Sequence, residues 1–243
     1  MLAVVNSSGW PAVRQAFFDA HIFSSSFGEI AHAFLLNVKV FCIAEAVILV
    51  AALGIAVLRG LPGPVLFPIR ALAIAYADLF RGIPTILVIY ILGFGAPTLG
   101  LSGVPKSPLF WGVTALVLVY SAYVSEVYRA GIESVHPSQE AAARSLGLSR
   151  AKALWFVVLP QAVRRVIPPL LNDFIGLQKD SALVALIGPI EAFRQSQIDV
   201  AGTFNYTPYV VTALLFVLLT IPLARFTDWL VARDRRRQAA GAR

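Results

Sequence analysis

Charged residues are scarce in this chain: they make up 14% of its 243 residues, whereas hydrophobic residues make up 58%. Soluble domains carry about a quarter charged residues, so this composition excludes an ordinary soluble protein and also a disordered one. The apolar runs are continuous and long, whereas the strands of a membrane barrel would alternate apolar with polar residues. We therefore expect an all-α membrane protein.

Cysteine and histidine are also rare. The single cysteine, Cys42, excludes an internal disulfide, and we interpret it as a small packing residue. The three histidines, His21, His32 and His136, share no metal-ligand spacing, so no metal site is expected. No glycine-rich loop ending in Lys-Ser or Lys-Thr is present, and the chain is therefore not expected to be an ATPase.

Five segments are apolar enough and long enough to cross a membrane, which takes about 20 residues. They lie at about 34–58, 64–96, 107–125, 166–190 and 207–229. The second would be about 48 Å long as a straight helix and carries three charges, so it is expected to bend, to lie partly in the interface or to cross twice. The expected divisions are an external N-terminal segment (1–33), a transmembrane domain (34–229) and a basic cytoplasmic tail (230–243).

The basic residues indicate the topology, because cytoplasmic loops carry an excess of Lys and Arg. Five crossings place 14 of the 20 basic residues on one side, against Arg14, Lys106 and Arg194 on the other. The N-terminus is then outside and the C-terminus inside. Six crossings would put the most basic loop outside, so we reject them. A net charge of +7 therefore concerns topology here rather than nucleic-acid binding.

The connection between the third and fourth segments is unusually long. It runs from about Glu126 to Val166, with the loop itself at about 129–165, although a few residues would suffice to join two helices. Residues 138–146 favour a helix that Gly147 ends, and Ser149 can cap a second helix at 150–158 that ends before Pro160. We expect a cytoplasmic helix-turn-helix; the alternative is a solvated connector.

This loop contains Glu140-Ala141-Ala142, Gly147, nine further residues, Val157, and Leu159-Pro160. The pattern resembles the EAA loop of ABC-importer permeases. The segments 126–132, 160–164, 179–183 and 81–84 resemble the polar amino-acid permease family, of the histidine, glutamine, glutamate and arginine uptake type. The similarity covers about 34–229.

Some positions depart from the family pattern. Counted back from Gly147, the family's glutamate position falls on Ala141, and Glu140 stands one residue earlier. Ile83 and Ala182 stand where the family commonly has Thr and Ser. Whether Glu140 takes the role of the family glutamate is left open.

The resemblance implies that the helix at 138–146 docks on a separate ATPase, which binds ATP and Mg, and that this chain holds no cofactor. The implied coupling residues are Glu140, Ala141, Ala142, Ala143, Gly147, Leu148, Leu159 and Pro160. The other implied partners are a second permease chain, identical or related, an external substrate-binding protein, a small amino-acid substrate and membrane lipid, with no nucleic acid. The implied location is the bacterial inner membrane, and the amino acid carried is not specified.

Ionisable side chains inside the spans are costly and usually functional. An amino acid carries a carboxylate and an ammonium group, so its path needs charges of both signs. The candidates for this path are Arg81, Asp173, Lys179, Asp180 and Ser181. The alternative is that Lys179 and Asp180 pair with neighbours and hold the bundle together.

Two other classes of function compete with an ATP-driven permease. A secondary transporter or channel would commonly show paired inverted repeats, and none is evident. A membrane-bound enzyme would need a catalytic constellation, which the sequence lacks.

Overall fold

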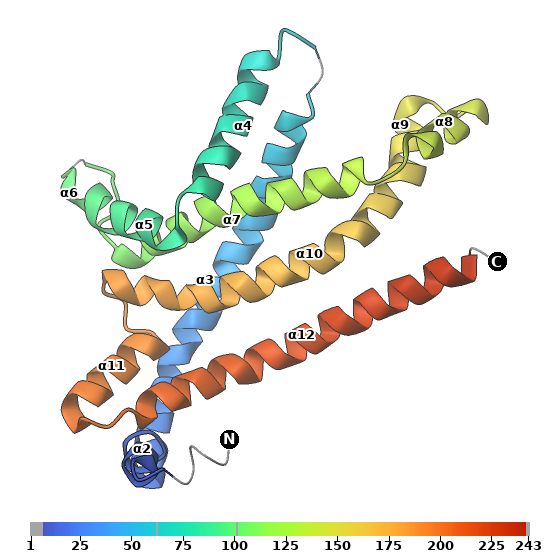
Figure 1. Ribbon diagram of the computed structural model, residues 1–243. Helices are drawn as coiled ribbons and strands as arrows, with labels where there is room; N and C mark the ends of the chain where they lie inside the picture. The colour runs from blue at the N-terminus through green and yellow to red at the C-terminus, as the bar shows by residue number, and fades with distance from the viewer. Residues whose placement is uncertain (1–6, 62, 101, 242–243) are drawn as a thin grey trace. The chain divides into compact units, whose positions relative to one another are not determined.

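The structure is a computed structural model that describes residues 7–61, 63–100 and 102–241, and over this range it contains helices and no strand (Figure 1). The chain divides into two compact units. The first comprises Met1–Ile43, Ile89–Thr114 and Gln178–Ile221; the second comprises Ala44–Val88, Ala115–Leu177 and Pro222–Arg243.

Four helical stretches of the described chain are long and apolar enough to cross a membrane, judged by length and composition. They are Trp10–Arg59, which includes α2 (Trp10–Phe17) and α3 (Ala20–Arg59); Pro108–Glu133, which is α7; Arg150–Ile187; and Thr207–Arg233, within α12 (Thr207–Gly241). A bent pair, Phe67–Gly82 with Thr85–Thr98, passes the same test when taken together.

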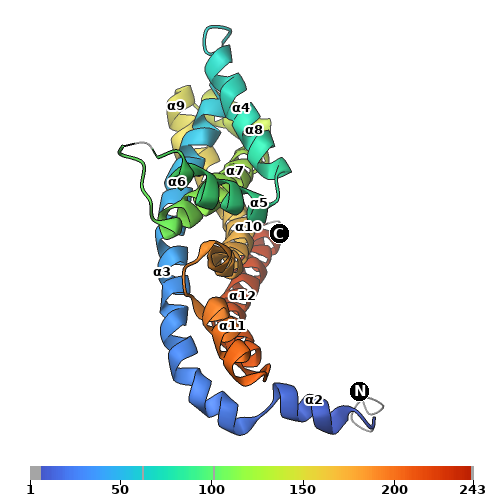
Figure 2. The same ribbon diagram turned by 90° about the vertical axis from the view of Figure 1, so that its left-hand side faces the viewer.

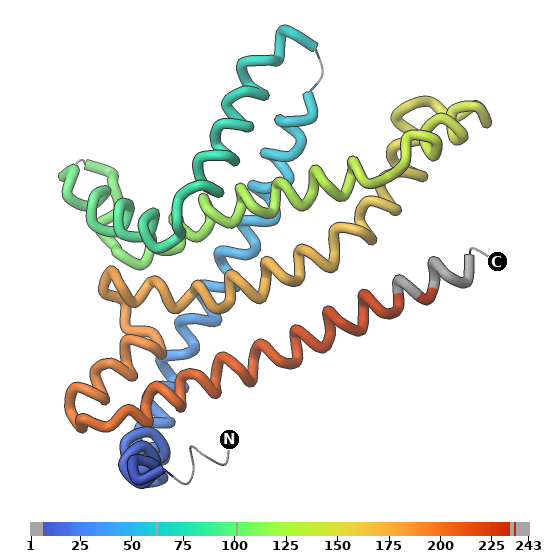
Figure 3. Tube along the Cα trace, in the orientation of Figure 1, coloured from blue at the N-terminus to red at the C-terminus, as the bar shows by residue number. Residues whose placement is uncertain are grey.

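The second predicted segment is sharply bent, as the sequence indicated. α4 (Phe67–Gly82) meets the stretch of α5 (Thr85–Tyr90), η1 (Ile91–Gly95) and α6 (Ala96–Thr98) at 103° (Figure 3). Ile83, between them, is extended, with φ −98° and ψ 130°. Proline disfavours a helical conformation in the residue before it, so Pro84 sets the position of the bend.

In the second unit, small residues bring α7 close to α10 (Leu159–Asp180). A Cβ added to Gly131 would lie 2.0 Å from Val166, and one added to Gly176 would lie 3.1 Å from the Tyr120 hydroxyl. Glycine at such points lets two helix backbones approach closely, as is common between membrane helices.

In the first unit, α3 packs on α12 and on α11 (Ala192–Thr203), a helix that was not expected. Ile30, Ala192 and Val211 are fully buried together, and Phe34 meets Phe216 edge to face with ring centroids 5.0 Å apart. α11 is short and too polar on average to be predicted as a span from its sequence.

The connection between the third and fourth segments is more helical than predicted. α7 continues to Glu133, and α9 (Arg150–Ala153), η2 (Leu154–Val158) and α10 follow one another without a break. The prediction that a helix ends before Pro160 was therefore wrong. The helix of the fourth segment begins earlier than the predicted span, and the boundary of that span at about residue 166 stays a prediction. η2 is a π-helical turn in which the Leu159 N–H donates to the Leu154 carbonyl. This wider turn interrupts the usual hydrogen-bond ladder just where Pro160 has no N–H to offer.

The helical stretch that corresponds to the predicted fourth span ends with the 3-10 helix η3 (Ser181–Ile187), close to the predicted end at about residue 190. The divisions at residues 33 and 230 stay predictions, because α3 and α12 run through them without interruption. Residues 1–6 and 242–243, at the two ends of the predicted outer segment and tail, lie outside the described residues.

Candidate functional site

The turn after α8 (Pro137–Ser145) is built as predicted. Gly147 has φ +90°, a conformation that favours glycine. The Leu148 N–H donates to the Ala143 carbonyl (3.3 Å), and the Gly147 N–H donates to the Arg144 carbonyl (3.0 Å). These two bonds form a Schellman motif, which satisfies carbonyls at the helix end and turns the chain sharply.

The next helix also begins as predicted, because the Ser149 hydroxyl accepts a hydrogen bond from the Lys152 N–H (3.4 Å). Next to this pair, Val135, which precedes α8, packs with Val158 of η2 and Ala162 of α10 in a small buried apolar cluster. The turn itself is ordered by the two Schellman bonds and the Ser149 cap.

The predicted coupling residues divide into exposed and inward-facing positions. Ala141 and Ala142 are exposed, whereas Ala143 is buried beneath them. Glu140 is half-buried, and its Oε1 lies 3.6 Å from Nε of Arg150 on α9. The remaining positions are Leu148 and Leu159, which are half-buried, and Gly147 and Pro160, which are exposed. α8 thus presents small side chains outward, next to Leu146, which is 85% exposed.

Glu126 on α7 is the centre of an ion-pair cluster in the second unit. It pairs with Arg59 at the end of α3, with Arg129 one turn further along α7, and with Arg81 at the end of α4 (3.7 Å). The Arg59 side chain is only 10% exposed. A charge this buried needs a partner, so Glu126 neutralises Arg59 and also orients Arg81.

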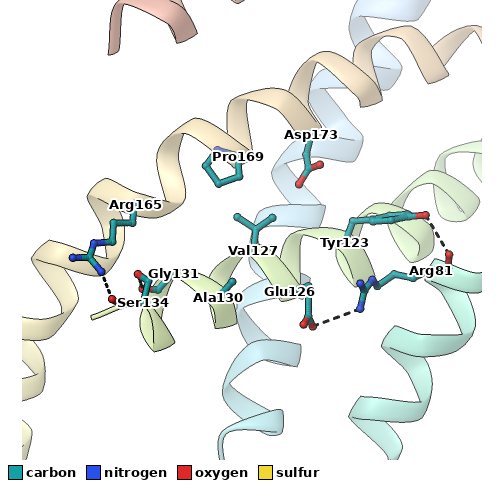
Figure 4. A pocket seen from close by; sticks show the side chains of 10 residues that line it. All are labelled: Arg81, Tyr123, Glu126, Val127, Ala130, Gly131, Ser134, Arg165, Pro169 and Asp173. Atoms are coloured by element: carbon teal, nitrogen blue, oxygen red, sulfur yellow. Dashed lines mark hydrogen bonds and ion pairs between the residues drawn. The ribbon is translucent and has the colours of Figure 1, made fainter. Parts of the chain in front are cut away.

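Arg81 and Asp173 line one pocket of about 370 Å³ in the second unit (Figure 4). Glu126 and Arg165 line it as well, so the wall carries two cations and two anions. One carboxylate oxygen of Asp173 is buried and has no hydrogen-bond partner among the described residues. The other lining residues are Tyr123, Val127, Ala130, Gly131, Ser134 and Pro169.

The other three candidate path residues, Lys179, Asp180 and Ser181, belong to the first unit. Lys179 lines a more apolar pocket of about 470 Å³, together with residues such as Phe193 and Tyr209. Ser181 is fully buried, and its hydroxyl donates to the Gln178 carbonyl (2.7 Å). Ser181 therefore has a structural partner, and Asp180 ends α10 beside it.

Sequence reasoning missed a buried polar cluster in the first unit. Glu191 is fully buried, and Asn37 is 2% exposed. The Asn37 amide donates to Glu191 (2.7 Å) and to Ser181 (3.3 Å), while its carbonyl oxygen accepts from the Ala192 N–H (3.1 Å). An asparagine inside an apolar run was a usable signal, but its partner stands 154 residues away in the sequence.

Comparison with known proteins identifies the family of this chain. The family model described as "binding-protein-dependent transport system inner membrane component" matches residues 52–236. The chain belongs to this family. The probable glutamine ABC transporter permease protein GlnM of Bacillus subtilis (strain 168) is 35% identical over 167 residues, which cover 68% of this chain and 76% of GlnM. The arginine transport system permease protein ArtQ of the same strain is 36% identical over 149 residues, covering 61% and 67%.

Solved structures agree with this assignment. The chain is similar to a crystal structure of an amino acid ABC transporter with histidines, at 31% identity and a TM-score of 0.76, with 84% of this chain and 93% of that chain covered. An inward-facing MetNI methionine ABC transporter shares the fold, at 17% identity and a TM-score of 0.65, covering 84% and 95%.

This binding-protein-dependent permease is a multi-pass membrane protein and a translocation subunit of an ABC importer. It is not an enzyme, because a separate ATPase hydrolyses ATP in such transporters. The family implies that ATPase and a second permease as partners. Membership of the family also decides against the secondary-transporter and membrane-enzyme alternatives.

Proposed function

We propose that this permease carries polar amino acids inward across the bacterial inner membrane, after an external binding protein delivers them. The single observation that carries the proposal is the pocket lined by Arg81, Arg165, Glu126 and Asp173. A free amino acid has a carboxylate and an ammonium group, and this wall offers partners for both. The names of GlnM and of the solved amino acid transporter support the same substrate class.

Asp173 is the sharpest candidate for the ammonium group of the substrate. Its buried carboxylate oxygen has no hydrogen-bond partner among the described residues, and a buried acceptor without a partner is costly. A passing ammonium group would satisfy it. Arg81 is already oriented by Glu126, and its remaining donors suit the substrate carboxylate.

We expect Asp173→Asn to lower amino-acid uptake by about tenfold or more, because a charge-assisted hydrogen bond to the substrate is replaced by a neutral one. Uptake is measured in vesicles that hold the permease, its ATPase and the binding protein. The matched control is Asp228→Asn, which removes an exposed carboxylate that pairs with the likewise exposed Arg225. Normal uptake by the Asp173 variant, with assembly intact, would remove Asp173 from the path.

We further propose that α8 is the lever on which the ATPase acts. Three features support this role: the ordered Schellman turn, the outward-facing Ala141 and Ala142, and the burial of Ala143. Small side chains let a groove on a partner approach a helix closely. The pair of half-buried Glu140 and exposed Arg150 lies beside this face, where Glu140 can serve the partner.

The proposed topology has five spans, with the N-terminus outside, the C-terminus inside and α8–α9 on the cytoplasmic face. The bent pair beginning with α4 counts as one span. The second permease chain is a copy of this one or a relative. ATP and Mg bind to the ATPase, and this chain holds no cofactor.

Labelling of single cysteines tests this topology. With Cys42→Ala as background, a cysteine at Lys106 should react with a membrane-impermeant maleimide added to intact cells, and one at Ser145 should react only after the membrane is opened. Ser145 is exposed at the end of α8, so its reactivity depends on the side of the membrane and not on burial. The reverse pattern would contradict the five-span arrangement and detach α8 from a cytoplasmic ATPase.

A further inference from the structure

The short helix α2 presents an apolar face that the described protein covers only in part: Trp10 is half-buried, whereas Val13 and Phe17 are exposed. Trp10, Val13 and Phe17 follow one another at spacings of three and four residues, so they share one face of the helix. No residue of α2 is buried, and Val13 is 42% exposed. Gln15 stands on the opposite face, and Arg14 flanks the apolar one.

α2 is fastened to the beginning of α12 within the first unit. The Tyr206 N–H donates to the Ala16 carbonyl (2.7 Å), and the Asn205 side chain donates to the Gln15 carbonyl (2.9 Å). The Phe17 and Tyr206 rings stack with centroids 5.0 Å apart. These bonds fix α2 as it turns away from α3 (Figure 2).

The same attachment sets the level of α2 relative to the membrane. The apolar run of α12 begins at Thr207, whose hydroxyl accepts a hydrogen bond from the Asp19 N–H (3.1 Å). Asp19 caps the start of α3 through the His21 and Ile22 N–H groups. α2 therefore lies where the apolar run of a span begins, which is the level of the interface between lipid and water.

The chemistry of the exposed face fits that interface. Trp and Tyr concentrate at the boundary between acyl chains and headgroups, where their rings are half in each medium. Trp10 and Tyr206 supply such rings, and Phe204 beside them is 87% exposed. Arg14, which is exposed, is placed to reach a lipid phosphate while its stem stays with the apolar face.

We propose that α2 is an interfacial helix that inserts its Trp10, Val13 and Phe17 face into the lipid headgroup region. Its partner is the phospholipid surface itself. By this contact α2 anchors the joined starts of α3 and α12 at one depth. The inference rests on the spans and not on the transported substrate.

Tryptophan quenching tests the proposal in the full chain, assembled with its ATPase in lipid nanodiscs. Trp111→Phe, Trp155→Phe and Trp229→Phe leave Trp10 as the one tryptophan of this chain, and the emission of a sample that also carries Trp10→Phe is subtracted as the background of the other proteins. The matched control adds Trp10→Phe and Gln15→Trp, which moves the probe to the opposite face of the same helix. We expect lipids brominated near the headgroup to quench Trp10 at least about threefold more strongly than the residue-15 probe, and aqueous iodide to show the opposite order.

Equal quenching of both positions by iodide would overturn the proposal, because the face would then be in water. Protection of Trp10 from both quenchers would also overturn it, since a protein surface would then cover the face. A nitroxide attached to Val13→Cys, with Cys42→Ala, repeats the comparison with native tryptophans: lipid-soluble oxygen should relax it more than a water-soluble nickel chelate.

Discussion

We expect Gly147→Val to abolish ATP-coupled transport while the chain still inserts at normal levels. Gly147 has φ +90°, and a branched side chain there costs on the order of 1–2 kcal/mol or more. The Schellman bonds from Gly147 and Leu148 would break or tilt, and α8 would lose its fixed direction. The measurement is copurification of the ATPase together with substrate-stimulated ATP hydrolysis, which we expect to fall by about tenfold or more.

Gly103→Val is the matched control for this variant. Gly103 has φ +92° and, like Gly147, has no atom within 4 Å of an added Cβ, so the two substitutions carry the same kind of backbone strain. Gly103 lies in the connection before α7 and belongs to the first unit, whereas the α8 turn belongs to the second. If both variants lose coupling equally, strain alone explains the loss and α8 has no special role.

Two companion variants separate shape from charge on α8. Ala142→Arg places a long side chain on the exposed face and should block docking as strongly as Gly147→Val. Glu140→Ala removes a long pair, 3.6 Å, with the exposed Arg150, and such pairs near the surface contribute about 0–1 kcal/mol to folding. A strong coupling defect from Glu140→Ala would therefore show that the family's acidic role has moved one residue along the chain.

Local signals in the sequence were enough to predict the α8 turn. Gly147 and Ser149 each act within a few residues, through a positive φ and a helix cap. The length and charges of the second segment predicted a bend only as one of three alternatives, and the role of Pro84 emerged from the structure. The passage of the helix through Pro160 was mispredicted, because proline normally ends a helix. The π turn that accommodates it has no comparable signal in the sequence.

Contacts between distant residues account for what the sequence did not reveal about the site. The pocket brings Arg81 on α4 together with Asp173 on α10, and Glu126 gathers arginines from three helices. Arg81 and Asp173 could be recognised from the sequence as costly charges within a span, whereas Glu126 was placed at the start of the long connection. The pairing of these charges depends on how the helices cross, and the hydrophobic runs in the sequence do not encode those crossings.

We expect Glu191→Ala, in the buried cluster of Asn37 and Glu191, to cause a large loss of stability. Glu191 accepts hydrogen bonds from the Phe193 N–H (3.0 Å) and the Arg194 N–H (2.8 Å), so it caps the start of α11. It also accepts from Asn37 on α3. Glu191→Ala removes three acceptor contacts at once and leaves the Asn37 amide without its closest partner in a buried site.

Leaving buried donors unpaired costs about 1–3 kcal/mol for each group, and loss of a helix cap costs about 1 kcal/mol. We therefore expect Glu191→Ala to destabilise the first unit by roughly 3 kcal/mol or more, which lowers the thermal midpoint by about 6–12 °C in a chain of this size. The measurement is thermal unfolding of the purified protein in nanodiscs. Glu29→Ala is the matched control, because Glu29 is an exposed carboxylate whose bond to Gln195 is 3.3 Å long.

A double-mutant cycle decides whether the loss comes from this pairing. Asn37→Leu removes the partner amide, so Glu191→Ala should cost less in that background, with a coupling free energy of about 1–3 kcal/mol. Additive effects of the two substitutions would show that the hydrogen bond between them contributes little. In that case Glu191 would stabilise α11 as a cap alone, and the tie between α3 and α11 would depend on the apolar packing of Ile30, Ala192 and Val211.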